Sequence, residues 1–288
     1  MANTLKIYSE FFGLEERPFT LLPDPDYLYW SDNHKRAYTM LEYGLLTHAP
    51  ITLITGEIGA GKTTLIRELL RTMPFDMTVG LVSNAQGDRG ELLHWVLMSL
   101  DQKFEHTSTY VQLFHQFQSF LISEYAAGRR TIIIFDEAQN LSVEALEELR
   151  MYSNINADKD ELLQLVLVGQ PQLIDLVNRP ELVQFCQRIV AEFHLKNMTG
   201  AEVHEYIRHR MEVAGAKRQV FSVDACDQVY LASNGTPRIV NQICDFALVY
   251  AYSYGRKTVD GKIIERVVAD RTKFGSGARN RAQQKPEV

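Results

Sequence analysis

The sequence has 288 residues, enough for one large domain or two modest ones, and 45% of them are hydrophobic, which allows a sizeable buried core. The formal net charge of −6 indicates no strongly basic surface for nucleic acid. Three widely spaced cysteines favour reduced thiols over a disulfide framework, and the eight histidines form no cluster of metal ligands. The N-terminus lacks a signal-peptide pattern, and no apolar run approaches the ~18 residues that span a bilayer, so we expect a cytoplasmic protein without a membrane span.

The first part of the chain, residues 1–48, is predicted to form a leader and one amphipathic helix with Ala37, Leu41 and Leu45 on its apolar face. Residues 51–55 then form a short apolar run rich in β-branched side chains, which predicts a buried parallel strand. Apolar residues recur at helical spacing after Lys62. The glycine-rich segment between them therefore lies in a strand-to-helix turn.

This turn reads GEIGAGKTT, which is the G-x-x-x-x-G-K-T pattern of a phosphate-binding loop. Its glycines can direct backbone N–H groups towards phosphate oxygens, and the following helix presents its positive end to the same anion. We expect Lys62 to contact the β- and γ-phosphates of ATP and the Thr63 hydroxyl to bind Mg²⁺. The expected nucleotide-binding residues of this loop are Gly56, Glu57, Ile58, Gly59, Ala60, Gly61, Lys62, Thr63 and Thr64.

A second acidic motif follows the apolar strand predicted at 132–135, in the sequence IIIFDEAQ. An acidic residue at the carboxyl end of a parallel strand lies in the crevice where α/β sheets bind ligands. We expect Asp136 to act through the hydration shell of the Mg²⁺ and Glu137 to orient and deprotonate the attacking water as a general base. The second acid favours an ATPase over a GTPase or a kinase. DEAQ also resembles motif II of helicases, but the partner motifs of helicases are missing downstream.

Three further polar positions could complete a hydrolysis site. Gln170 ends the strand predicted at 163–168 and could sense the γ-phosphate or hold the water. Arg188 lies where a helix leads into a β-branched strand, and Arg238 follows Pro237 in the first turn of a long apolar helix. A cation at a helix start is unfavourable by itself, and a nearby triphosphate would explain it. A surface glutamine, a salt-bridged arginine and a solvated arginine are the alternative interpretations.

Five strands separated by helices, near 51–55, 79–83, 132–135, 163–168 and 190–195, predict a mainly parallel sheet covered on both faces. From about residue 197 the strand pattern ends and four helical segments follow, the first with Thr199 as its cap. The predicted fold is α/β, with a P-loop core at 49–196, a small all-helical lid at 197–272 and a disordered tail at 273–288.

With these motifs the chain resembles the AAA+ ATPases of the ExeA type, also called general secretion pathway protein A, which are related to TniB/TnsC-like transposition ATPases. The leader motif beginning at Tyr8, the segment PDPDYLYWSDNHKRAYTMLEYGL and the motifs GEIGAGKTT, IIIFDEAQNLS, LVLVGQPQL, QRI and NGTPRIVNQIC carry the resemblance. It covers roughly residues 7–272.

The resemblance implies site roles for individual residues. Gln170 falls on the first sensor, Arg188 on the arginine finger that acts on a neighbouring subunit, and Arg238 on the second sensor of the lid. The leader from Pro18 to Tyr29 would lie against the adenine. The secretion protein usually continues into a transmembrane helix and a peptidoglycan-binding domain. This sequence ends at KFGSGARNRAQQKPEV, so we do not expect a direct cell-wall role.

The resemblance thus leads to a main hypothesis and two alternatives. The main one is an oligomeric Mg²⁺-dependent ATPase that powers assembly of a membrane-associated secretion, pilus or polysaccharide-export system and attaches to the inner membrane through partners. A DNA-bound regulator of a transposition module is the first alternative. The loops at 84–91 and 156–162 are mixed or acidic, which favours the secretion-like interpretation. A nucleotide-gated scaffold with negligible turnover is the second alternative, and Glu137 argues against it.

Overall fold

The computed structural model describes residues 7–22, 24–73, 76–83, 91–105, 107–157 and 160–273. Its contacts divide the chain into two compact units. The core unit consists of Asp32–Ile58 and Leu65–Lys196, and the lid unit consists of Met1–Ser31, Gly59–Thr64 and Asn197–Val288. The phosphate-binding segment therefore groups with the lid unit, although it connects two elements of the core unit.

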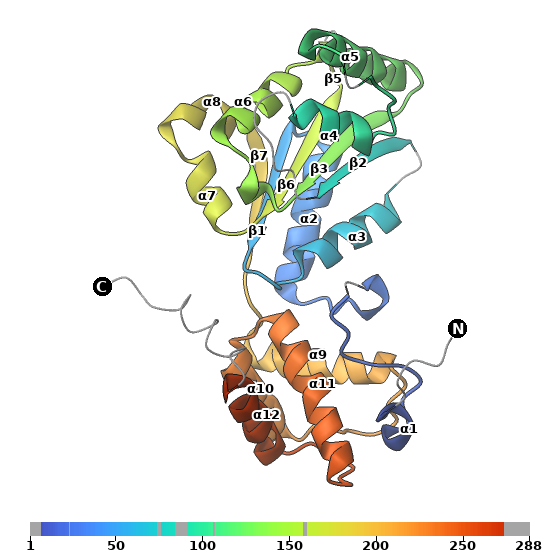
Figure 1. Ribbon diagram of the computed structural model, residues 1–288, viewed down its shortest axis with the longest axis vertical. Coiled ribbons are helices and arrows are strands. Elements are labelled where there is room, and N and C mark those ends of the chain that lie inside the picture. The colour runs from blue at the N-terminus through green and yellow to red at the C-terminus, as the bar shows by residue number, and fades with distance from the viewer. Residues whose placement is uncertain are drawn as a thin grey trace. The chain divides into compact units, whose positions relative to one another are not determined.

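The core unit is built on a five-stranded sheet with the strand order β2-β3-β6-β1-β7, in which all neighbouring strands are parallel (Figure 1). The sheet agrees with the parallel sheet expected from the sequence, and each predicted strand corresponds to one of its strands. The strands are β1 (Ile51–Gly56), β2 (Met77–Ser83), β3 (Arg130–Asp136), β6 (Leu163–Gly169) and β7 (Ile189–Leu195), and a short antiparallel pair is formed by β4 (Asn156–Ala157) and β5 (Asp160–Glu161).

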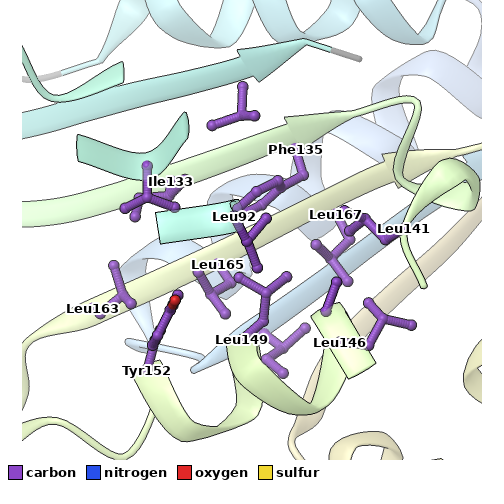
Figure 2. Packing of buried hydrophobic residues seen from close by; sticks show 14 of the residues in the cluster. Leu92, Ile133, Phe135, Leu141, Leu146, Leu149, Tyr152, Leu163, Leu165 and Leu167 are labelled. Carbon is purple, nitrogen blue, oxygen red and sulfur yellow. The ribbon is translucent and has the colours of Figure 1, made fainter. Parts of the chain in front are cut away.

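The central strands are apolar on both faces because helices cover both sides of the sheet. Odd-numbered residues such as Ile133, Phe135 and Leu165 pack in one cluster with Leu146 and Leu149 of α6 (Figure 2). The described helices of the core unit are α2 (Asp32–Leu46), α3 (Lys62–Thr72, from Leu65 on), α4 (Leu92–Ser99), α5 (Tyr110–Ala126), α6 (Val143–Tyr152), α7 (Gln172–Val177) and α8 (Val183–Cys186), with 3-10 turns η2 (Ala138–Asn140) and η3 (Pro180–Leu182).

Helix α2 covers the other face, where it packs on β1 and β7 over Thr52 and Ala191. A Cβ on Gly44 would lie 2.2 Å from Thr52 Oγ1, so glycine allows the helix to approach β1 closely. The buried side chain of Gln164 donates from Nε2 to the carbonyl oxygens of Gly44 (3.1 Å) and Leu45 (3.2 Å). The same two carbonyls also accept the backbone N–H groups of Ala49 (2.8 Å) and His48 (3.3 Å), so Gln164 adds a second donor to each at the end of α2.

In the part of the chain that the structure describes, the lid unit contains four C-terminal helices and the leader with its own short helix, and all of them contribute to one hydrophobic cluster. Phe19 of the leader is 1% exposed, and the leader carbonyls of Pro18 and Thr20 accept hydrogen bonds from Arg210 Nε (2.5 Å) and Asn241 Nδ2 (3.1 Å). The elements are α1 (Ser9–Phe12), η1 (Pro25–Tyr27), α9 (Gly200–Val213), α10 (Val223–Ser233), α11 (Pro237–Ser253) and α12 (Gly261–Lys273).

The predicted N-terminal segment 1–48 is thus divided by the structure at Ser31 and Asp32. The leader joins the lid cluster because its aromatic residues pack there, whereas α2 contacts β1 and β7 of the sheet. The predicted tail, 273–288, lies outside the described residues except for Lys273, which ends α12. Among the helices of the described ranges, none combines the length and the apolar character needed to cross a bilayer.

Candidate nucleotide-binding site

The phosphate-binding loop connects the end of β1 to the start of α3, as the sequence predicts. Gly59 and Gly61 have φ angles of 81° and 101°, in the left-handed region that glycine enters without a steric penalty. Lys62 is the first residue of α3 and is 7% exposed. A loop with these backbone angles at the N-terminus of an 11-residue helix fits a bound triphosphate, because helix N-termini and such turns present N–H groups to anions.

The other residues of the loop differ in their exposure. Glu57 and Ile58 are exposed, whereas Ala60 is buried, at 1% exposure. Thr63 and Thr64 are half-buried in the first turn of α3. A hydroxyl at position 63 is a hard oxygen donor of the kind that Mg²⁺ prefers.

The start of α11 packs against this loop inside the lid unit. The Arg238 backbone N–H donates to the carbonyl oxygen of Gly59 at 3.2 Å. A Cβ added to Gly59 would lie 2.6 Å from Arg238 Cβ and 3.4 Å from Thr236 Cγ2. The structure therefore brings the predicted second-sensor arginine beside the phosphate loop and shows why residue 59 must be glycine.

The second acidic motif follows the carboxyl end of β3. Asp136 ends the strand, and its Oδ1 accepts a hydrogen bond from the Glu137 N–H at 3.0 Å. Glu137 has φ 57° and ψ 39°, a left-handed conformation that is uncommon for residues other than glycine. Backbone strain of this kind is concentrated at functional sites, where surrounding contacts maintain it.

The Glu137 carboxylate is held by two glutamine side chains. Gln170 Nε2 donates to Glu137 Oε2 at 3.0 Å, so the structure brings together the predicted sensor and the predicted base. Gln139 Nε2 donates to the same oxygen at 2.7 Å. Gln139 is a site residue that the motifs alone did not identify, although its position two residues after Glu137 in DEAQ is a signal for it.

The register of the sheet aligns the ends of these strands. Asp136 of β3 is paired with Val168 of β6, and Gly169 of β6 is paired with Thr55 of β1. The acidic motif, the turn that carries Gln170 and the start of the phosphate loop therefore leave the sheet at the same edge. This is the edge where parallel α/β sheets bind ligands.

Arg188 lies just before β7 and binds the end of α6 in its own chain. Its Nη1 donates to the carbonyl oxygen of Ser153 (3.1 Å) and to Ser153 Oγ (3.2 Å), and its Nη2 donates to Asn154 Oδ1. Burial raises the pKa of the nearby Glu161 carboxyl, and the Arg188 charge acts in the opposite direction. In this conformation Arg188 stabilises the C-terminus of α6, and its role as a finger for a neighbouring subunit stays a prediction.

A magnesium site made by protein side chains alone is not present among the described residues, where no three His, Cys, Asp or Glu side chains gather. Mg²⁺ in phosphate-transfer sites is commonly held by one or two protein oxygens together with the substrate phosphates. Thr63 and Asp136 each carry an oxygen donor of the kind that Mg²⁺ prefers.

Comparison with known proteins adds an independent line of evidence. Residues 46–177 match the family described as AAA domain. General secretion pathway protein A of Aeromonas hydrophila is 38% identical over 258 residues, which cover 89% of this chain and 47% of that protein. The chain thus spans about half the length of this curated relative.

Solved structures with a similar fold include the ORC2 protein of Aeropyrum pernix, determined as ADPNP–ADP complexes (TM-score 0.62, 16% identity, 83% of this chain and 67% of that chain). They also include a Walker-type ATPase of Pyrococcus abyssi (TM-score 0.61, 17% identity, 93% and 80%) and the RuvB Holliday junction branch migration motor of Thermotoga maritima (TM-score 0.52, 18% identity, 87% and 73%). At these identities the likeness concerns the fold. The chain therefore contains an AAA domain of the P-loop type and is related along most of its length to general secretion pathway protein A.

Proposed function

We propose that this chain is a Mg²⁺-dependent AAA+ ATPase that hydrolyses ATP as a homo-oligomer. The observation that carries the proposal is the Glu137 carboxylate, held in a left-handed turn by Gln139 and Gln170 at the sheet edge where the phosphate loop begins. A phosphate loop alone would suit a binding protein. An oriented carboxylate at the same edge supplies the base that hydrolysis needs.

Each residue has a defined task in this proposal. The loop glycines and Lys62 bind the phosphates, and Arg238 contacts the γ-phosphate side from the lid. When bound through Thr63 and Asp136, Mg²⁺ would neutralise charge on the phosphate oxygens. Glu137 orients the attacking water and accepts its proton, and Gln170 fixes the carboxylate that does so. Arg188 of an adjacent subunit stabilises the charge that develops during transfer.

Two substitutions test the enzymatic part. Lys62→Ala removes the charge that binds the phosphates and should abolish binding of a fluorescent ATP analogue. Glu137→Gln removes the base while preserving shape, so ATP should still bind while phosphate release stops. Glu105→Gln is the matched control, because this exposed glutamate lies in a loop before α5. Wild-type turnover by the Glu137→Gln protein would refute the assignment of the base.

The cellular role is inferred from the similarity to general secretion pathway protein A. We propose that ATP turnover powers or regulates assembly of a membrane-associated secretion, pilus or polysaccharide-export system, with attachment to the inner membrane through its protein components. The competing role is that of a DNA-bound regulator of transposition. Residues 84–90 of the first discriminating loop (84–91) and residues 158–159 of the second (156–162) lie outside the described residues.

A stimulation assay separates the two roles. The ATPase rate is measured with and without duplex DNA at low salt, where phosphate contacts are strongest. An unchanged rate supports the export role, and recovery of export components with the Glu137→Gln protein, which retains ATP, would support it further. A rate that rises with DNA length would support the transposition role instead.

A further inference from the structure

Three side chains at the end of the sheet form a closed ring of hydrogen bonds. Gln139 Nε2 and Gln170 Nε2 both donate to Glu137 Oε2, at 2.7 Å and 3.0 Å. The ring is closed by Gln139 Oε1, which accepts the backbone N–H of Gln170 at 2.9 Å. Gln139 therefore contacts both the side chain of Glu137 and the backbone of the turn that carries Gln170.

The orientation of the Gln139 amide is fixed by chemistry. The backbone N–H of Gln170 can only donate, so the atom that receives it must be the amide oxygen of Gln139. The NH₂ group of Gln139 is then directed at Glu137, and it cannot accept a proton from that carboxyl group. Gln139 is consequently a donor to Glu137 in every state in which its bond to Gln170 persists.

The surrounding backbone is shaped for this side chain. Gln139 lies in the one-turn 3-10 helix η2, directly after the left-handed Glu137. A Cβ on Gly169 would approach Gln139 Oε1 to 2.9 Å and Leu173 Cδ2 to 2.7 Å. Glycine at 169 thus leaves the space that the Gln139 amide occupies beside the end of β6.

We infer that Gln139 is a positioning residue for the reaction: it sets the direction of the Glu137 carboxylate and ties it to the turn that carries Gln170. This inference rests on the proposed ATPase function. Because the two donors come from the ends of adjacent strands, a displacement of the β6 turn is transmitted to the base through Gln139. The expected consequence of its loss is a lower kcat with little change in ATP affinity.

The sharpest test is Gln139→Glu, which keeps the shape and exchanges the NH₂ donor for oxygen. One oxygen can still accept the Gln170 N–H, and the other faces Glu137. Two carboxylates that close repel each other, and the new side chain has no N–H to donate to Glu137. The kcat of the variant should therefore fall, while the affinity for ATP, which the phosphate loop provides, is retained.

The expected loss of kcat follows from the rate acceleration that a correctly oriented general base provides. General-base catalysis contributes roughly 10²–10⁴-fold to rate, and a misdirected carboxylate retains part of it. We expect kcat to fall by about 10- to 100-fold in Gln139→Ala and Gln139→Glu at pH 8, with the affinity for an ATP analogue within about twofold of wild type. Asn140→Asp is the matched control, since it places the same new charge on the exposed next residue of the same turn.

Each outcome is decisive. Loss of kcat with retained ATP binding in both variants supports the inference. Turnover that depends on Glu137 but matches the Asn140→Asp control in both Gln139 variants would overturn this inference and leave the proposed function intact. Parallel loss of ATP affinity and folding in both variants would make Gln139 a structural residue. Absence of hydrolysis by the wild type would refute the proposed function and this inference with it.

Discussion

Replacing Gly59 by alanine tests whether the phosphate loop and the start of α11 are fitted to each other. Gly59 has φ 81°, and a Cβ at this position would lie 2.6 Å from Arg238 Cβ. Gly128 offers a matched control. Its φ is 75°, yet nothing lies within 4 Å of the position its Cβ would take. Both substitutions place a Cβ on a left-handed residue, but only Gly59→Ala also brings that Cβ into contact with another side chain.

The magnitudes follow from this difference. A left-handed conformation costs a residue with a Cβ about 1–2 kcal/mol, and about 0.4–1 kcal/mol is recovered because alanine restricts the unfolded chain. Gly128→Ala should thus cost about 1 kcal/mol of unfolding free energy. Non-bonded carbons prefer a separation of about 3.5–4.0 Å, so Gly59→Ala must also move the loop and Arg238 apart by about 1 Å. Such overpacking adds about 1–3 kcal/mol.

This movement of about 1 Å would displace the residues that we expect to hold the phosphates. Displacements of about 1 Å in a positioned site can cost about 10²-fold, so ATP affinity should fall at least tenfold in Gly59→Ala and stay unchanged in Gly128→Ala. Titration with a fluorescent ATP analogue measures affinity, and urea unfolding measures stability. If Gly59→Ala bound ATP as tightly as Gly128→Ala, the close packing of α11 on the loop would have no part in nucleotide binding.

Three further predictions concern charged side chains. Arg238→Ala should reduce the preference for ATP over ADP in competitive binding, since the lost contact is on the γ-phosphate side. If the wild-type protein bound the two nucleotides with equal affinity, this prediction would have no basis. Arg188→Ala and Glu137→Gln proteins should each be inactive and regain part of the activity when mixed, because an arginine supplied by a neighbouring subunit can be worth ~10³–10⁵ in rate. If activity per subunit were independent of concentration and mixing gave no rescue, Arg188 would have only its role at the end of α6. Hydrogen bonds from Arg129 lower the pKa of Glu124. These bonds therefore stabilise the folded state above the ordinary pKa of glutamate, and this stabilisation is lost as the pH falls through the lowered pKa of Glu124. The urea midpoints of wild type and Arg129→Met should therefore differ slightly at pH 7 and converge at acid pH, and a difference that persists there would contradict the assignment.

The sequence by itself determined the elements whose signal is local. A run such as Ile132–Phe135 is apolar at every position, which is typical of a strand buried on both faces, and the structure has β3 there. The phosphate loop was equally clear, because glycines at 59 and 61 followed by Lys62 have few other uses between a strand and a helix. Asp136 and Glu137 were identifiable because they follow a buried strand directly.

Only the tertiary structure decided how distant segments combine. The sequence gives no reason for the leader around Phe19 to pack with Arg210 and Asn241 rather than with α2, because that choice depends on which apolar surfaces fit each other. Arg188 binds the end of α6 because the fold brings it to Ser153 and Asn154, which lie 35 and 34 positions earlier in the chain. Gln139 acquires its role from Gln170, which is 31 residues away and becomes its neighbour because β3 and β6 are adjacent in the sheet. A local pattern determines which residues form a strand or a phosphate loop, whereas the pairing of strands determines which polar side chains meet at their ends.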